Sequence, residues 1–500
     1  MPTLLRLARG RFALLSLMAV CVLGLAASHA WAQATPSAPV PAPTADTGSI
    51  SSGDTAWMLI SAALVMLMVP GLALFYGGMV RRKNILGTMM HSMAALAIIG
   101  AEWIAIGYAM SFGTDHHGII GWDTDRLLLW NILPQQARAG THIPEYVFMV
   151  YQGMFAIITP ALIAGAIAER VKFSAYLLFI LGWGLLVYNP VAHWIWGGGW
   201  MGPETHDGLF HLGAYDFAGG IVVHVTAGAS ALITALYLGK RIGYPESVLQ
   251  PNSLVLTLLG AGILWFGWFG FNGGSALGSN TTAGLAFTTT QFAAVGGALS
   301  WMIAEWLKHG RPTSMGLASG LVAGLATVTP AAGFVSPASG LLIGIIAGFV
   351  CFRAVLAKAK LGYDDSLDAF GVHGIGGFMG AIFVGVFART ALNADGVDGA
   401  IAGHSQQVLI QLSAASIVAV YSIAGTWVLM MLVNKVVGFR IPRSLEIEGM
   451  DAGLHGEQGW MLEQITVPSI GLPGDQSVDW KGSPENRPAG VRMREESADV

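Results

Sequence analysis

Charged residues and cysteines are scarce in this chain of 500 residues. Asp, Glu, Lys and Arg together make up 11% of it, whereas a soluble domain carries about 25%. This shortage excludes an ordinary soluble globular protein. The two cysteines are Cys21 and Cys351, and Cys21 lies in a segment that we expect to be removed. The mature chain therefore has no disulfide framework.

Long apolar stretches take the place of the missing charge. Hydrophobic residues make up 54% of the chain, in runs of about 20 residues, which is the length of a membrane-spanning helix. Strands of a β-barrel would instead show short alternating patterns. We therefore expect an all-α integral membrane protein with eleven transmembrane helices. The predicted spans are 57–79, 86–112, 146–167, 173–197, 216–239, 253–273, 283–306, 314–332, 337–357, 369–389 and 405–434.

The N-terminus has the pattern of a cleaved signal peptide over residues 1–32. Three arginines precede an apolar run, and Ala30-Trp31-Ala32 supplies a cleavage site before Gln33. An uncleaved anchor helix is the alternative. Residues 33–54 are rich in Pro, Ala, Thr and Ser, which predicts a flexible linker. A cleaved signal would place this linker in a periplasm.

The distribution of basic residues predicts the direction of the spans. Starting outside, eleven spans leave the C-terminus inside. The loops predicted inside are all basic, whereas those outside hold Arg126, Arg138 and little else, as the positive-inside rule requires. The basic residues of the inner loops are Arg81, Arg82, Lys83, Arg170, Lys172, Lys240, Arg241, Lys308, Arg311, Lys358, Lys360, Lys435, Arg440 and Arg443. We expect a multi-pass protein of the bacterial cytoplasmic (inner) membrane, with a periplasmic N-terminus and a cytoplasmic C-terminus.

Spans five and ten share a pattern that indicates an inverted repeat. Asp216 precedes His224 in the fifth span, and Asp368 precedes His373 in the tenth. The fifth span enters from outside and the tenth from inside. Eleven spans therefore divide into five plus five plus one, with a site expected at the interface of the two halves. Chance similarity of short glycine-rich strings is the alternative.

The two histidines are the first candidates for function. An ionisable group within hydrocarbon is costly, and imidazole is tolerated because it can be neutral while changing its charge near neutral pH. His224 and His373 suggest a lined path for a species that carries or loses a proton. The alternative is two histidines with only packing roles. A metal site lacks clustered ligand spacing and a third ligand, so we expect no metal.

Motifs distributed across the membrane domain carry a family resemblance. The most specific is DFAGGIVVHVTAGASALITALYLGKR from 216 to 241. Others are GDTAWM at 53–58, PGLALFYGGMVRRKN at 70–84, YQGMFAIITPALIAGAIAERVKFSA at 151–175, AHWIWGGG at 192–199, GWFGFNGGSA at 267–276, DAFGVHGIGG at 368–377 and EGMDAGLHGE at 448–457. Together they resemble the ammonium transporter family (Amt, Mep and Rh proteins), in particular its bacterial Amt type, over roughly 53–460.

The resemblance implies roles for individual residues. It implies an outer NH4+ recruitment site of Phe155, Trp196 and Ser275 with Tyr151 beside them, where aromatic faces attract a cation and a hydroxyl accepts a hydrogen bond. Phe155 and Phe271 match a gate of stacked phenylalanines. His224, His373 and Trp268 match the pore. Asp216 is expected to cap the start of the fifth span, and it matches a family aspartate with a structural or cation-tuning role. The alternative role of Trp196 is to anchor its helix at the membrane–water interface. The alternative role of the two phenylalanines is packing in the protein core.

The implied function is ammonium transport, with methylammonium as a further possible substrate. Ammonium would be recruited outside, deprotonated, and conducted as the neutral species through a hydrophobic pore lined by the twin histidines. The resemblance implies a homotrimer and no cofactor, and the chain has no motif of an enzyme. Rh-type gas conduction is one alternative. An ammonium sensor that signals through its C-terminal tail is the other.

The tail follows the membrane domain predicted over 55–434. Residues 435–500 resemble the family's cytoplasmic tail, a docking region for PII-type regulatory proteins, and the stretch from about 466 is predicted to be disordered. Gly459 and Trp460 stand where relatives often have alanine and tyrosine. This departure and the extra stretch put the details of PII control in doubt.

Three further acidic positions complete the expectations from sequence. Asp368 is expected to cap the tenth span, and Asp364 and Asp365 are expected at the surface of an inner loop. Glu102 lies deep in the second span. Three alternatives account for this position: the side chain extends to the membrane–water interface, it pairs with His91, or it faces another subunit.

Overall fold

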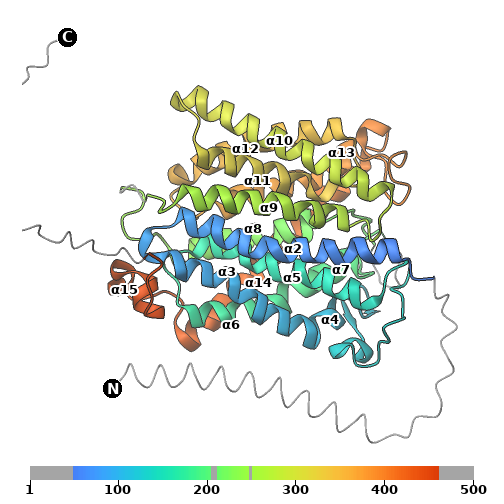
Figure 1. The fold of residues 1–500 in the computed structure, drawn as a ribbon, viewed down its shortest axis with the longest axis horizontal. Coiled ribbons are helices and arrows are strands. Elements are labelled where there is room, and N and C mark those ends of the chain that lie inside the picture. Colours follow the sequence, from blue (N-terminus) through green and yellow to red (C-terminus); the bar gives the residue numbers. More distant parts are fainter. Residues whose placement is uncertain (1–48, 204–210, 247–249, 461–500) are drawn as a thin grey trace, which may run out of the picture. The chain divides into compact units, whose positions relative to one another are not determined.

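The computed structural model of the protein describes residues 49–203, 211–246 and 250–460. The predicted signal peptide, most of the predicted linker and the stretch beyond 460 lie outside the described residues, so the structure tests neither cleavage nor disorder there. Within the described part, long helices lie side by side (Figure 1). The all-α prediction holds apart from one hairpin of two three-residue strands in the loop after the second span.

Helices account for most of the described residues, and several of them contain a π-helical segment. The α-helices are α2 (Ser52–Met79), α3 (Ile85–Glu102), α4 (Tyr108–Phe112), α5 (Glu145–Ile167), α6 (Phe173–Trp183), α7 (Asn189–Trp196), α8 (Thr226–Leu238), α9 (Leu254–Gly274), α10 (Thr281–His309), α11 (Ser314–Val328), α12 (Pro337–Leu361), α13 (Ile375–Phe387), α14 (Gln406–Val437) and α15 (Arg443–Glu448). The π-helical segments are η2 (Trp103–Gly107), η4 (Gly184–Tyr188), η5 (Gly220–Val225), η7 (Phe370–Gly374) and η9 (Asp451–His455). The 3-10 turns are η1 (Arg82–Asn84), η3 (Thr124–Leu129), η6 (Thr329–Ala331) and η8 (Ala400–Ala402). The strands β1 (Thr114–His116) and β2 (Ile120–Trp122) pair antiparallel, with Asp115 opposite Gly121.

Ten helical segments of the described residues are long and apolar enough to cross a membrane. They coincide with ten of the eleven predicted spans. The remaining predicted span, 283–306, falls on α10, which has 29 residues and at 1.5 Å per residue reaches roughly 43 Å. Ten candidate spans are therefore established, and the count of eleven stays a prediction.

The two histidine-bearing spans cross at glycines. The segment α8 packs against η7, and α13 packs against η5, as expected for two antiparallel helices. A Cβ atom on Gly228 would lie 2.1 Å from the Cα of Gly374, and one on Gly377 would lie 2.6 Å from the Cβ of His224. Real side chains do not fit at such distances, so only glycine allows these backbones to meet. This crossing brings the two histidines together.

Aspartates cap the N-terminal ends of both spans. The carboxylate of Asp216 accepts hydrogen bonds from the backbone N–H groups of residues 219–222 at 2.6–2.9 Å. In the tenth span, Asp365 accepts from the N–H groups of Ala369 and Phe370. The prediction that Asp368 is this cap was therefore wrong. Asp368 has φ +64° and contacts the ammonium group of Lys358 instead.

A buried ion cluster joins several of the loops that the sequence predicts to lie inside. Glu169 accepts hydrogen bonds from Arg81, Asn84 and Arg241, and Arg241 also donates to both carboxylate oxygens of Asp364. Burial alone would raise the pKa of Glu169, but Arg241 and Arg81 outweigh it and lower that pKa to about 2.

This cluster overturns one prediction from the sequence. Asp364 and Asp365 were expected at the surface of an inner loop, yet each is only 1% exposed. Asp364 is bound by Arg241, and Asp365 caps the tenth span. Two charged side chains are thus withdrawn from water because the fold supplies them with donors.

The first part of the C-terminal tail packs against the N-terminal end of α3. Asp451 accepts hydrogen bonds from the N–H groups of Leu86 and Gly87, at 3.1 and 2.8 Å, and so satisfies free donors in the first turn of that helix. The N–H of Met450 donates to the side-chain oxygen of Asn84 at 2.8 Å. The segments α15 and η9 are therefore part of the folded unit.

Candidate functional site

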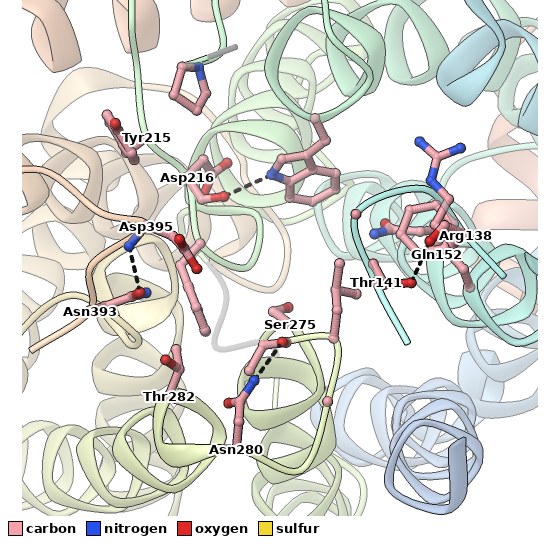
Figure 2. Close-up of a pocket in the computed structure, with 18 of the residues that line it drawn as sticks. Arg138, Thr141, Gln152, Tyr215, Asp216, Ser275, Asn280, Thr282, Asn393 and Asp395 are labelled. Carbon is pink, nitrogen blue, oxygen red and sulfur yellow. Dashed lines mark hydrogen bonds between the residues drawn. The ribbon is translucent and has the colours of Figure 1, made fainter. Parts of the chain in front are cut away.

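A cavity of about 610 Å³ opens between the ends of several helices and loops. Among its lining residues are Phe155, Trp196, Ser275 and Asp216, four of the residues singled out in the sequence. Figure 2 shows the labelled side chains of Ser275, Asp216 and Gln152 around this space, contributed by different segments. We call it the outer cavity.

The aromatic residues of the outer cavity are held by their helices. Phe155 lies on α5, and Trp196 is the last residue of α7. Their rings meet edge to face, with centroids 5.9 Å apart. The indole N–H of Trp196 donates to the backbone oxygen of Asp216 at 2.8 Å (Figure 2). This bond fixes the orientation of the ring that borders the cavity.

The hydroxyl oxygen of Ser275 is placed to accept a hydrogen bond in the outer cavity. Ser275 follows α9 directly, and its hydroxyl donates to the backbone oxygen of Phe271 at 2.9 Å. Since its hydrogen is engaged there, its lone pairs are available to a donor in the cavity. The hydroxyl of Tyr151 lies 3.1 Å from that of Ser275. Tyr151 is fully buried and is not among the described residues that line the cavity, so it supports Ser275 from behind.

Two phenylalanines close the bottom of the outer cavity. The rings of Phe155 and Phe271 have centroids 4.2 Å apart at an interplanar angle of 33°, and each residue is 1% exposed. Phe155 lines the outer cavity, and Phe271 lines a second, smaller cavity. The two cavities therefore meet at this pair of rings.

The second cavity, which we call the inner cavity, holds the two histidines. Its volume is about 10 Å³, which is near the minimum that admits one water molecule. His224, His373 and Trp268 line it, and the other lining residues are apolar. This narrow space has almost no room for the hydration shell of an ion.

The imidazole rings of His224 and His373 are stacked, with centroids 5.2 Å apart and an interplanar angle of 18°. Both ring nitrogens of His224 and the Nδ1 of His373 are buried without a hydrogen-bond partner among the described residues. Trp268 packs on His224 with centroids 5.6 Å apart, and its indole N–H donates to Thr329 at 2.9 Å. The structure thus brings together all three residues predicted for the pore.

One face of α9 serves both cavities. Trp268, Phe271 and Ser275 are spaced three and four residues apart, so they lie on the same side of the helix. Trp268 and Phe271 line the inner cavity, and Ser275 lines the outer one. This helix face therefore sets the order of Trp268, Phe271 and Ser275 along the two cavities.

Several polar residues of the outer cavity were not anticipated from the sequence. Arg138, Gln152 and Asp395 line it, and Arg138 lies over the ring of Phe148, 4.6 Å from its centroid. They come from loops and from α5, and no local pattern marks them as neighbours. Within the described ranges, no group of three or more His, Cys, Asp or Glu residues is placed to hold a metal ion.

Comparison with known proteins assigns the family. Residues 56–460 match the model of the Ammonium Transporter Family. The chain is 45% identical to an ammonium transporter of Aquifex aeolicus over 421 residues, which cover 84% of this chain and 96% of the relative. The crystal structure of Candida albicans Mep2 matches with a TM-score of 0.74 and 33% identity, over 80% of this chain and 89% of the other. A solved structure named Sensor Amt Protein matches with a TM-score of 0.70 and 27% identity, over 80% and 97% of the two chains. This chain therefore belongs to the ammonium transporter family.

Proposed function

We propose that this protein recruits NH4+ at its outer cavity, where the ion gives one proton to solvent water near the phenylalanine pair, and that it conducts neutral ammonia through the inner cavity. The observation that carries the proposal is the order of the two cavities. A wide polar cavity with aromatic walls is separated by Phe155 and Phe271 from a narrow apolar one that contains the histidines.

The outer cavity suits a small cation that can donate hydrogen bonds. The ring faces of Phe155 and Trp196 offer partial negative charge, with each cation–π contact contributing about 0.5–2 kcal/mol depending on desolvation. The lone pairs of Ser275 can accept an N–H from ammonium. Na+ and K+ have no N–H to donate, so this hydrogen bond is available to ammonium alone, while the exclusion of the metal ions depends on the narrow inner cavity. Asp216 adds little fixed charge toward the cavity because four backbone N–H groups engage its carboxylate.

The inner cavity suits a neutral molecule. A charged ion in a space of about 10 Å³ would lose its hydration shell with no replacement, at a cost of several kcal/mol. Ammonia is neutral, so the free-energy cost of leaving water is far smaller for it. Unpartnered nitrogens of His224 and His373 can accept or share a hydrogen bond along the path. As a coupled pair, the imidazoles can also carry a proton by a separate route.

Purified protein in liposomes tests the proposal. Uptake and current are measured together with ammonium, methylammonium, K+ and Na+ at several pH values, since a net neutral step carries no current. We expect saturable transport of ammonium, weaker transport of methylammonium, and none of K+ or Na+. Transport that matches that of empty liposomes for ammonium would contradict the proposal.

We also propose the inverted five-plus-five arrangement with an eleventh helix, a periplasmic N-terminus after signal cleavage and a cytoplasmic tail. Basic inner loops support the direction, and family membership supports assembly as a homotrimer. Cysteine labelling of intact cells should reach the 113–145 loop from the periplasm but not the 434–500 tail. Labelling of the tail from outside would contradict the orientation. Native mass spectrometry gives the oligomeric state.

Binding of a cytoplasmic PII-type protein to the tail is a further proposal. It rests on the family resemblance of residues 448–457 and on the contact of this segment with α3, where Asp451 caps the helix. Pull-down of purified PII protein with wild type but not with a chain truncated after 437 is the expected result.

Ammonium sensing is the second candidate function. Two observations favour it: the match to the structure named Sensor Amt Protein, and the packing of the tail against the transmembrane unit. A sensor would change the protease accessibility of its tail when ammonium binds. Identical tail cleavage with and without saturating ammonium would leave transport as the function.

A further inference from the structure

Glu102 is a carboxyl group buried within the candidate span Arg82–Phe112. It is 5% exposed, so its side chain does not extend to the membrane–water interface. In the part of the chain that the structure describes, no Lys, Arg or His forms an ion pair with it. Since a carboxylate without a cation is costly in hydrocarbon, its protonation state needs an explanation.

Its hydrogen bonds point to one answer. The side-chain nitrogen Nδ2 of Asn189 donates to Oε1 of Glu102 at 2.6 Å. The other oxygen of each group, Oε2 of Glu102 and Oδ1 of Asn189, is buried without a partner among the described residues. Both are acceptors if Glu102 is ionised, and a buried acceptor without a donor is unfavourable.

We infer that Glu102 is a neutral carboxylic acid whose Oε2 hydroxyl donates to Oδ1 of Asn189. One proton then satisfies both unpartnered oxygens, and acid and amide form a ring with two hydrogen bonds. An exchange of nitrogen and oxygen in the Asn189 amide gives the same ring with the roles of the two Glu102 oxygens reversed.

The surroundings of the ring are built around the carboxyl group. A Cβ atom on Gly107 would lie 2.9 Å from both oxygens of Glu102, and one on Gly184 would lie 3.3 Å from Oε2. Gly107 ends the π-helical segment η2, and Gly184 begins η4. Both spans therefore have a glycine, without a side chain, next to the carboxyl group. Both also have a π-helical segment there, and such segments are frequent at functional sites.

The ring fixes the start of α7. Asn189 is the first residue of that helix and Trp196 is the last, so the ring ties the recruitment tryptophan to the second span. Glu102 is in this sense a positioning residue. The effect on recruitment rests on the proposed function, whereas the protonation state of Glu102 does not.

Infrared spectroscopy of the full chain in liposomes tests the protonation state without any transport. We expect the C=O band of a protonated carboxylic acid in the wild type, shifted in D2O and missing in Glu102→Gln. Glu246→Gln, which removes an exposed carboxylate, is the matched control and should keep the band. Loss of a carboxylate band in Glu102→Gln, with no change in the acid region, would show that Glu102 is ionised and overturn the inference.

Transport tests the positioning role. Glutamine supplies both the acceptor and the donor of the ring, so Glu102→Gln should keep the apparent ammonium affinity within about twofold. Glu102→Leu leaves the Asn189 amide unpaired and should weaken that affinity about tenfold or more. Wild-type affinity in Glu102→Leu would refute positioning. The infrared comparison does not use the leucine variant, so it remains decisive if that variant fails to insert.

Discussion

A carboxyl group at the histidine pair, ionised when K+ lies beside it, should let K+ through the inner cavity. The perturbation is His224→Asp or His373→Glu, with His224→Asn as a neutral control of similar size to aspartate. In the wild type the pair carries no fixed negative charge, in a cavity of about 10 Å³. A potassium ion there has neither its hydration shell nor a counter-charge.

The stacked geometry sets the magnitude. The two ring centroids are 5.2 Å apart, so K+ beside His373 would lie about 5 Å from a carboxylate at position 224. At an effective dielectric constant of about 20, Coulomb's law gives roughly 3 kcal/mol of attraction at that distance. A barrier lowered by this amount raises the rate about 10²-fold. The asparagine control has no such attraction and should only reduce ammonium transport.

The assay is K+ current and K+ uptake in liposomes that contain folded, inserted protein. We expect both acidic variants to conduct K+ well above the wild type, and His224→Asn to exclude it. If both acidic variants exclude K+ as strictly as the wild type and transport ammonium normally, then the charge at this pair does not govern what crosses, and the proposed mechanism is wrong.

Three further predictions concern other parts of the molecule. Trp196→Leu should weaken apparent ammonium affinity roughly 2- to 30-fold, the loss of one cation–π contact; unchanged affinity would leave Trp196 as an interfacial anchor. Arg241→Met leaves Glu169 without its main cation and should destabilise the protein by about 3–5 kcal/mol at neutral pH, as measured by thermal unfolding in detergent. Because the pKa of Glu169 is lowered from 4.5 to about 2, the stabilisation from this group is present above pH 4.5 and is lost as the pH falls toward 2, so the difference between variant and wild type should shrink over that range. Gly228→Ala should abolish folding or transport, because its Cβ would lie 2.1 Å from a backbone atom of the neighbouring helix. Gly284→Ala is the control and should behave as wild type, because open space surrounds that position. A Gly228→Ala variant with normal transport would contradict the tight crossing.

The sequence alone was sufficient for the helical membrane architecture and for the family. Bilayer thickness requires about 20 consecutive apolar residues for each helix, so spans are visible as local runs, and ten of them recur in the structure. Motifs around His224, His373 and Trp196 are also local strings. Through the family resemblance they named His224, His373 and Trp196, which line the two cavities, but not the other polar residues of the outer cavity.

Contacts between distant residues were beyond the sequence. Asp364 and Asp365 are polar residues of a loop, which locally indicates a surface, yet both are buried because Arg241 and the tenth span supply their donors. Asp368 looked like the cap of that span by position. The backbone instead turns at Asp368 with φ +64° and leaves the capping to Asp365.

Glu102 illustrates the same limit. Its partner Asn189 is 87 positions away in the chain, whereas the local pattern suggested His91 on its own helix as one partner. For Phe155 and Phe271 the family resemblance suggested a stacked pair, and the structure supplies its geometry, with ring centroids 4.2 Å apart at the boundary between the cavities. The hydrophobicity of each span depends only on its own amino-acid composition, so it can be read from a local stretch of sequence. Hydrogen bonds, ion pairs and cavities depend on distances of a few ångströms between segments, and only the packed tertiary structure decides those.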